Sequence, residues 1–153
     1  MKFGQAIDSV LFKNYFNLEG KASRSEYWWF MLFFIIFNFV AGIIVGIIVG
    51  ISQGADFNPD TFSLYYTLGL LALFILPLLG LTVRRFADAG RGKREAIVVF
   101  VLAMISQLII PTGGAQGAII PVAEFLIMPA WIVLGATGLY TLYIALKKSV
   151  TKI

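Results

Sequence analysis

Four long stretches of the chain carry no charged residue, and short segments that hold the charges separate them. The stretches cover residues 27–55, 61–83, 96–123 and 125–146. About 20 apolar residues cross a bilayer as an α-helix, and lipid offers the backbone no other hydrogen-bond partner. The pattern predicts an all-α membrane protein, a four-transmembrane-helix bundle. We place its spans near 27–51, 61–83, 96–112 and 122–146.

The third stretch is the weakest of the four, because prolines and glycines interrupt it after residue 110. A helix over 96–110 alone is short by about one turn for a typical bilayer. The interrupting residues are Pro111, Gly113, Gly114, Gly117 and Pro121. Two interpretations stay open: the third span is short and little tilted, or the segment 111–121 dips back into the membrane.

The basic residues are confined to three of the five segments outside the spans. All twelve Lys and Arg residues lie before the first span, between the second and third, or after the fourth. The charged residues of the other two loops are Asp56, Asp60 and Glu124. Because loops rich in Lys and Arg stay cytoplasmic, both termini and the loop near 84–95 are predicted to be cytoplasmic. Three or five spans would break this sidedness.

Local signals mark the ends of the predicted helices. Ser23, with Glu26 three residues later, predicts an N-cap and a capping box at the start of the first span. Asn58 and Pro59 predict a cap and a first helical proline for the second span. Gly90 predicts that the second helix continues past the membrane and ends in a left-handed turn.

Residues 3–18, ahead of the first span, have the pattern of a short amphipathic helix. The apolar side chains that fall near one face are Phe3, Ile7, Val10, Leu11 and Leu18. Such a helix can lie on the inner leaflet of the membrane. It can equally pack against the cytoplasmic end of the bundle, and the sequence leaves both interpretations open.

The composition agrees with a membrane protein and narrows its chemistry. The chain has 153 residues, predicted to form one domain over 1–153, and 59% are hydrophobic while 13% are charged. Soluble domains are usually about half apolar and about a quarter charged. The chain has no cysteine and no histidine, which removes disulfides, thiolate nucleophiles, imidazole acid–base chemistry and common zinc ligands. No acid–base pair, activated nucleophile or metal-ligand cluster is visible, so we expect no catalytic, cofactor-binding or metal-binding residues and no enzyme activity. The positions of the basic residues explain the positive charge without a nucleic-acid partner.

The end of the second span carries the densest group of charges. Arg84 and Asp88 are four residues apart on the predicted helix and are expected to face one another. We predict a cytoplasmic polar cluster formed by Arg24, Glu26, Arg84, Arg85, Asp88 and Arg91. The cluster either sets topology and pins two helices through salt bridges, or it binds anionic lipid head groups or a phosphate-bearing ligand.

Small residues and prolines inside the spans bear on helix packing. Gly42, Gly46 and Gly50 repeat every four residues and form a flat face that another helix can approach closely. That helix belongs either to the same bundle or to a second copy of the chain. Pro77 and Pro129 are expected to kink the second and fourth spans.

Few polar residues lie within the spans, and none near a midplane is ionisable. They are Asn38, Ser106, Gln107, Thr137 and Thr141. Coupled transporters usually keep an ionisable side chain at that depth. Glu124, near the outer end of the fourth span, is the one candidate, and we interpret it as an interfacial residue rather than an ion-coupling site. We expect a non-enzymatic membrane module whose cluster binds lipid head groups, a ligand or a partner protein, as a monomer or homo-oligomer. The alternative is a small transporter or channel, including a dimeric one.

Two motifs resemble those of a known family. The first is residues 18–30, and the second is Leu76-Pro77 followed by residues 83–91. They resemble the G-R-x-x-R-x-E-[FY]-W and R-R-L-H-D-x-G-R-S patterns of the bacterial inner-membrane family called domain of unknown function 805. Lys21 and Ala87 stand where that family usually has Arg and His. The second half of the chain shows no comparable motif.

The resemblance implies a location and a set of characteristic positions, and it supplies no reaction. The location is the bacterial cytoplasmic membrane. The characteristic positions carried over are Gly20, Arg24, Glu26, Tyr27, Trp28, Arg84, Arg85, Asp88, Gly90 and Arg91.

Overall fold

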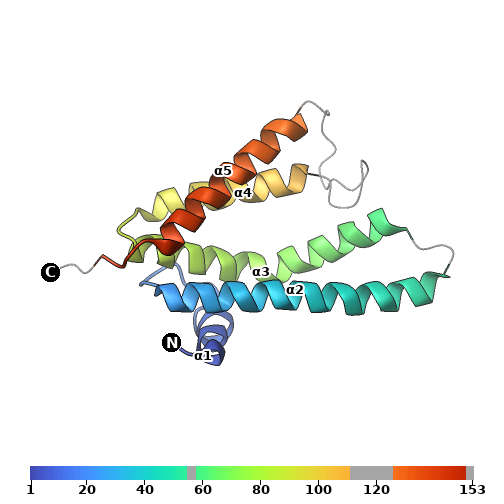
Figure 1. Cartoon of the computed structure of the whole chain (residues 1–153), viewed down its shortest axis with the longest axis horizontal. Helices are drawn as coiled ribbons and strands as arrows, with labels where there is room; N and C mark the ends of the chain where they lie inside the picture. Colours follow the sequence, from blue (N-terminus) through green and yellow to red (C-terminus); the bar gives the residue numbers. More distant parts are fainter. Residues whose placement is uncertain (55–57, 111–125, 151–153) are drawn as a thin grey trace.

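The structure is a computed structural model that describes residues 1–54, 58–110 and 126–150. All regular structure within these residues is helical. The elements are α1 (Phe3–Asp8), the π-helical segment η1 (Ser9–Lys13), α2 (Arg24–Gln53), α3 (Pro59–Asp88), α4 (Lys93–Ile109) and α5 (Ile127–Leu146). Figure 1 shows that α2 runs beside α3 and α4 beside α5, and that the short α1 lies across the start of α2.

Three helices, α2, α3 and α5, are long and apolar enough to cross a membrane. The predicted third span corresponds to α4, which has 17 residues and rises about 26 Å, slightly less than the hydrocarbon core of a bilayer. It ends at Ile109 rather than 112, and α5 begins at Ile127 rather than 122. The segment 111–121, with its alternative re-entrant path, lies outside the described residues.

The outer surface of the helices is apolar over much of its area. Ile35 is 64% exposed, Ile51 80% and Leu139 71%, and these are three of many large hydrophobic side chains that no part of the described chain covers. A water-soluble monomer rarely exposes so large a continuous apolar surface. Such a surface is typical of a helical bundle embedded in lipid.

The buried core is concentrated at the end of the bundle where α2 begins and α3 ends. Phe30 and Leu81 are fully buried there, and Phe74 makes edge-on ring contacts with Phe34 and Phe37 at centroid distances of 5.0 and 5.2 Å. A second apolar cluster joins α3, α4 and α5. Its buried members are Val83, Phe86, Ala89, Ala96 and Ile144. Both clusters bury apolar side chains at this end of the molecule.

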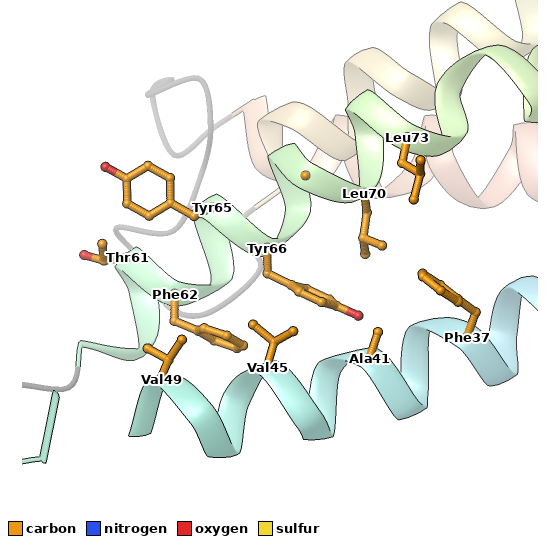
Figure 2. Close-up of a pocket in the computed structure, with 11 residues that line it drawn as sticks. Phe37, Ala41, Val45, Val49, Thr61, Phe62, Tyr65, Tyr66, Leu70 and Leu73 are labelled. Atoms are coloured by element: carbon orange, nitrogen blue, oxygen red, sulfur yellow. The ribbon is translucent and has the colours of Figure 1, made fainter. Parts of the chain in front are cut away.

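Two of the three glycines on α2 accept aromatic rings from α3. A methyl group at Gly42 would lie 3.4 Å from the hydroxyl of Tyr66, and one at Gly46 would lie 3.7 Å from the ring of Phe62. Figure 2 shows these two rings reaching from α3 toward α2. The Tyr66 hydroxyl donates a hydrogen bond of 2.7 Å to the carbonyl of Asn38. Packing inside the bundle therefore occupies part of the glycine face, while Gly50 has no close neighbour among the described residues.

The two prolines behave differently from one another. Pro77 lies inside α3, which changes direction midway along its length (Figure 1), as expected for a proline that removes a backbone hydrogen bond. The expected kink at Pro129 is wrong, because this residue occupies the first turn of α5. Amide groups in the first turn have no partner within the helix, so proline is tolerated there without bending it.

The N-terminal helix is shorter than predicted and ends at Lys13 instead of residue 18. Asn14 ends it, since its side-chain amide donates to the carbonyl of Ser9 at 3.0 Å and competes with further helical bonding. Ala6 and Val10 are fully buried, so the segment packs against the bundle. Phe12 points outward and is 78% exposed.

Candidate functional site

The predicted cluster lies at the end of the molecule where α2 and α4 start and α3 and α5 end (Figure 1). Ser23 caps α2 as predicted, because its hydroxyl accepts the backbone N–H of Glu26 at 3.2 Å. The reciprocal half of the capping box is absent from the described hydrogen bonds. The Glu26 carboxylate instead accepts the hydroxyl of Ser9 at 2.9 Å and the guanidinium of Arg84 at 3.0 Å.

Arg84 and Glu26 form a buried ion pair between α3 and α2. Their side chains are only 4% and 8% exposed. The carbonyl of Arg84 also accepts the backbone N–H of Ala22 at 3.1 Å. With Ser9 on the same carboxylate, the pair ties the N-terminal segment, α2 and α3 together.

The partner of Asp88 is Arg85, so the expected pairing of Arg84 with Asp88 is wrong. Successive residues of a helix point about 100° apart. Arg84 therefore faces α2, while Arg85 faces α5 and bonds to Asp88 three residues later. Both side chains of this second pair are buried as well. The sequence spacing allows either arginine to pair with Asp88, and the positions of α2 and α5 determine that Arg85 is the partner.

Arg85 also caps the C-terminal end of α5. Its guanidinium donates to the carbonyl of Ala145 at 3.2 Å and to that of Lys147. The last carbonyls of a helix have no partner within it and carry partial negative charge. The cation therefore stabilises both the Asp88 carboxylate and the end of α5.

Asp88 holds the segment that follows α5. Its carboxylate accepts the hydroxyl of Ser149 at 2.5 Å, and its backbone carbonyl accepts the N–H of Val150 at 2.9 Å. These bonds place residues 147–150 across the end of α3. Ser9 and Ser149 were not among the predicted site residues, because a serine hydroxyl gives no sequence signal for a partner that is distant along the chain.

Gly90 adopts the predicted left-handed conformation, with φ of 79°. The N–H of Arg91 bonds the carbonyl of Phe86 at 2.8 Å, and that of Gly90 bonds Ala87 at 3.2 Å. This pair of bonds is the Schellman arrangement that ends helices. A methyl group on Gly90 would also lie 3.0 Å from the side chain of Val150. Glycine is therefore required by the turn and by the packing of the following segment.

The remaining two predicted residues are at the surface. Arg24 is exposed and has no carboxylate within ion-pair distance in the described chain. Arg91 is 40% exposed and approaches Glu95 at 3.8 Å, while Glu95 accepts the hydroxyl of Tyr140. The six predicted residues thus divide into four buried members and two surface cations.

The four buried residues form two ion pairs with one another, Arg84 with Glu26 and Arg85 with Asp88. Two cations face two carboxylates, so their formal charges cancel. Three guanidinium nitrogens, Nε and Nη2 of Arg84 and Nε of Arg85, have no hydrogen-bond partner within the described residues. The arrangement is a clamp that joins η1, α2, α3 and the end of α5, and its carboxylates are engaged inside it. Surface cations around the clamp, rather than its members, can meet an external anion.

Neither the curated proteins nor the solved structures that were compared match the chain. A family model described as a protein of unknown function, DUF805, matches residues 15–149. The match extends well past the two motifs, through α4 and α5 to the segment held by Asp88. The chain therefore belongs to the DUF805 family of proteins of unknown function.

Proposed function

We propose that the chain is a non-enzymatic, multi-pass module of the bacterial cytoplasmic membrane that binds anionic lipid head groups. In this proposal all four helices α2 to α5 cross the bilayer and both termini are cytoplasmic. The cytoplasmic end of the bundle presents its exposed cations to the head groups of the inner leaflet.

The distribution of basic residues is the observation that supports the proposal. Within the described chain, every Lys and Arg lies before α2 or in its first turn, near or beyond the end of α3, at the start of α4, or after α5. Figure 1 shows these elements meeting at one end of the bundle. The exposed cations among them are Lys2, Lys13, Lys21, Arg24, Arg91, Lys93, Arg94 and Lys148. Cations near an anionic membrane surface each contribute about 1 kcal/mol of attraction.

The buried clamp supplies a fixed platform for these surface cations. It holds the ends of α3 and α5 and the start of α2 in one arrangement through hydrogen bonds that cross the bundle. The surface cations are therefore carried on a rigid end, which lowers the entropy lost when they engage a charged surface.

The orientation can be tested directly because the chain has no cysteine. Single variants Lys93→Cys, Ser52→Cys and Leu126→Cys are labelled with a membrane-impermeant maleimide in spheroplasts. We expect Ser52→Cys and Leu126→Cys to react, and Lys93→Cys to react only after permeabilisation. Labelling of Lys93→Cys from outside would contradict the orientation, and protection of Leu126→Cys would contradict a membrane crossing by α4.

Lipid binding can be tested by native mass spectrometry of the purified protein with phosphatidylglycerol and phosphatidylcholine of identical chains. A Lys93→Gln, Arg94→Gln, Lys148→Gln variant is expected to lose most of the preference for phosphatidylglycerol. Lys93→Arg, Lys148→Arg keeps the charge and is the matched control. Equal retention of both lipids by the wild-type protein would overturn the proposal.

A transporter or channel is the second candidate, and one cavity favours it. This cavity, of about 370 Å³, lies between α2, α3 and α4 and reaches both Asn38 and Gln107. None of its lining residues is Asp, Glu, Lys or Arg, which favours the first proposal over ion-coupled transport. Glu124 lies outside the described residues. Solute flux into proteoliposomes that is lost in Asn38→Ala would support transport.

A further inference from the structure

One face of α2 carries a row of side chains that begins at the basic end and reaches the middle of the helix. Trp28, Met31, Ile35 and Asn38 follow Arg24 at intervals of three or four residues, so they stand in one line along the helix. From Trp28 to Asn38 this row lines two adjoining cavities.

The two cavities lie between α2 and the other three long helices. The one nearer the basic end has a volume of about 420 Å³, and Ala103 of α4 and Gly138 of α5 line its far wall. The second, of about 370 Å³, extends to Gln107. Phe34 and Leu78 line both, so the two cavities are neighbours, and together they are called here the α2 groove. Its size is in the range of small-molecule binding sites.

The α2 groove and Arg24 together span the thickness of one membrane leaflet. From Arg24 to Asn38 the helix rises about 21 Å at 1.5 Å per residue. Half of a bilayer, including its head groups, is about 20–22 Å thick. Together they therefore have the depth of one upright lipid, with a cation at the level of the head group and a mainly apolar wall below it.

Arg24 is suited to hold an anion at the mouth of this groove. It is the first residue of α2, it is exposed, and no carboxylate of the described chain pairs with it. A phosphate at this position would pair with the guanidinium and would also meet the positive end of the α2 helix dipole.

We propose that the α2 groove binds one anionic phospholipid of the inner leaflet, with its phosphate on Arg24 and an acyl chain between α2, α4 and α5. The inference rests on the proposed function and deepens it, because it names one specific lipid site within a generally basic surface. The phosphate fixes the head group, and Trp28 and Met31 contact the upper part of the chain.

Glycines on α5 provide a matched pair of variants for the acyl-chain part. Gly138 lines the groove and Gly135 does not line either cavity, yet an added methyl group would meet no atom within 4 Å at either position. Gly138→Leu should fill the groove, displacing about two chain methylenes and weakening lipid binding about tenfold. Gly135→Leu should leave binding unchanged. Ala103→Leu enters the groove from α4 and should repeat the effect of Gly138→Leu.

Arg24→Gln tests the head-group part. The measurement is titration of the delipidated protein in detergent with phosphatidylglycerol or phosphatidylcholine, followed by native mass spectrometry. The wild-type protein should retain one phosphatidylglycerol. Arg24→Gln should lose about tenfold of its affinity for this lipid while phosphatidylcholine binding is unchanged. Inorganic phosphate should not compete at millimolar concentration, since it lacks the chain.

The outcomes separate this inference from the wider proposal. If Gly138→Leu and Ala103→Leu bind phosphatidylglycerol as the wild type does, the groove does not hold the lipid, even where the surface cations still select anionic lipid. If Arg24→Gln keeps full affinity, the head group does not bind there. If inorganic phosphate competes, the site recognises a free anion and the inference is wrong. A monodisperse elution profile shows that each variant is folded.

Discussion

The hydroxyl of Tyr15 donates a 2.8 Å hydrogen bond to the carbonyl of Leu73. This carbonyl receives no hydrogen bond from within α3, because the residue four positions later is Pro77. Proline has no N–H and cannot continue the helical hydrogen-bond ladder. In a membrane an unpaired carbonyl is costly, and here the N-terminal segment supplies the missing donor. The hydrogen bond from Tyr15 therefore links the N-terminal segment to the point where α3 bends.

Removing that hydroxyl should destabilise the protein. Tyr15→Phe is expected to lower the free energy of unfolding by about 1 kcal/mol, measured by thermal unfolding in detergent. Tyr65→Phe is the control, because Tyr65 is 69% exposed. In a Pro77→Ala background, residue 77 regains its N–H and the loss caused by Tyr15→Phe should shrink. An equal loss in both backgrounds would contradict the link between the two residues.

Gly80 should tolerate no side chain. A methyl group there would lie 3.0 Å from the carbonyl oxygen of Asn17, so Gly80→Ala must displace the N-terminal segment and is expected to cost about 1–3 kcal/mol. Gly69 is in the same helix with nothing within 4 Å, so Gly69→Ala should be neutral or stabilising by up to about 1 kcal/mol. Comparison of the two melting temperatures checks the prediction, and equal values would refute it.

Breaking one member of a buried pair should cost far more than removing a surface cation. Arg84→Met leaves the Glu26 carboxylate buried with Ser9 as its remaining described side-chain donor and is expected to cost about 3–5 kcal/mol. Replacing both members, Arg84→Met with Glu26→Gln, should recover part of this loss. Arg91→Gln, at an exposed pair, should change stability by less than about 1 kcal/mol. A double variant as unstable as the sum of its single changes would argue against the pairing.

The exposed side of the N-terminal segment should contact the bilayer. Phe12 is 78% exposed, and Lys13 beside it pairs with Asp8 at 2.6 Å while remaining largely exposed. Spin labels at Phe12→Cys and Lys13→Cys should differ in collision with lipid-soluble oxygen and with a water-soluble nickel chelate. The spin label at position 12 should collide more often with oxygen, and the label at position 13 more often with the nickel chelate. The same response at both positions would mean that the segment does not lie at the membrane surface.

Features that depend on nearby residues could be predicted from the sequence. The cap at Ser23, the cap that Asn58 gives to the N–H of Thr61, and the left-handed Gly90 follow from local chemistry and are confirmed. The long apolar helices α2, α3 and α5 follow from the lengths of the uncharged stretches.

Features that depend on the placement of other helices could not be predicted. The choice of Arg85 over Arg84 as partner of Asp88 depends on where α5 ends. The contact of Tyr15 with Leu73 joins residues that share no periodic pattern. The expected kink at Pro129 is wrong because α5 begins at Ile127, five residues later than the predicted start near 122, so this proline lies in the first turn rather than in the helix interior.

The bonds between Asp88 and residues 149–150 also bear on the order of assembly. The groups that complete the environment of Arg85 and Asp88 come about sixty residues later in the chain. A ribosome that has just released α3 into the membrane has made both ionised side chains but none of the acceptors and donors contributed by α5 and its extension. In the proposed topology the two charges stay at the aqueous boundary until α5 inserts, which makes the closing of this end of the bundle a late event in its biogenesis.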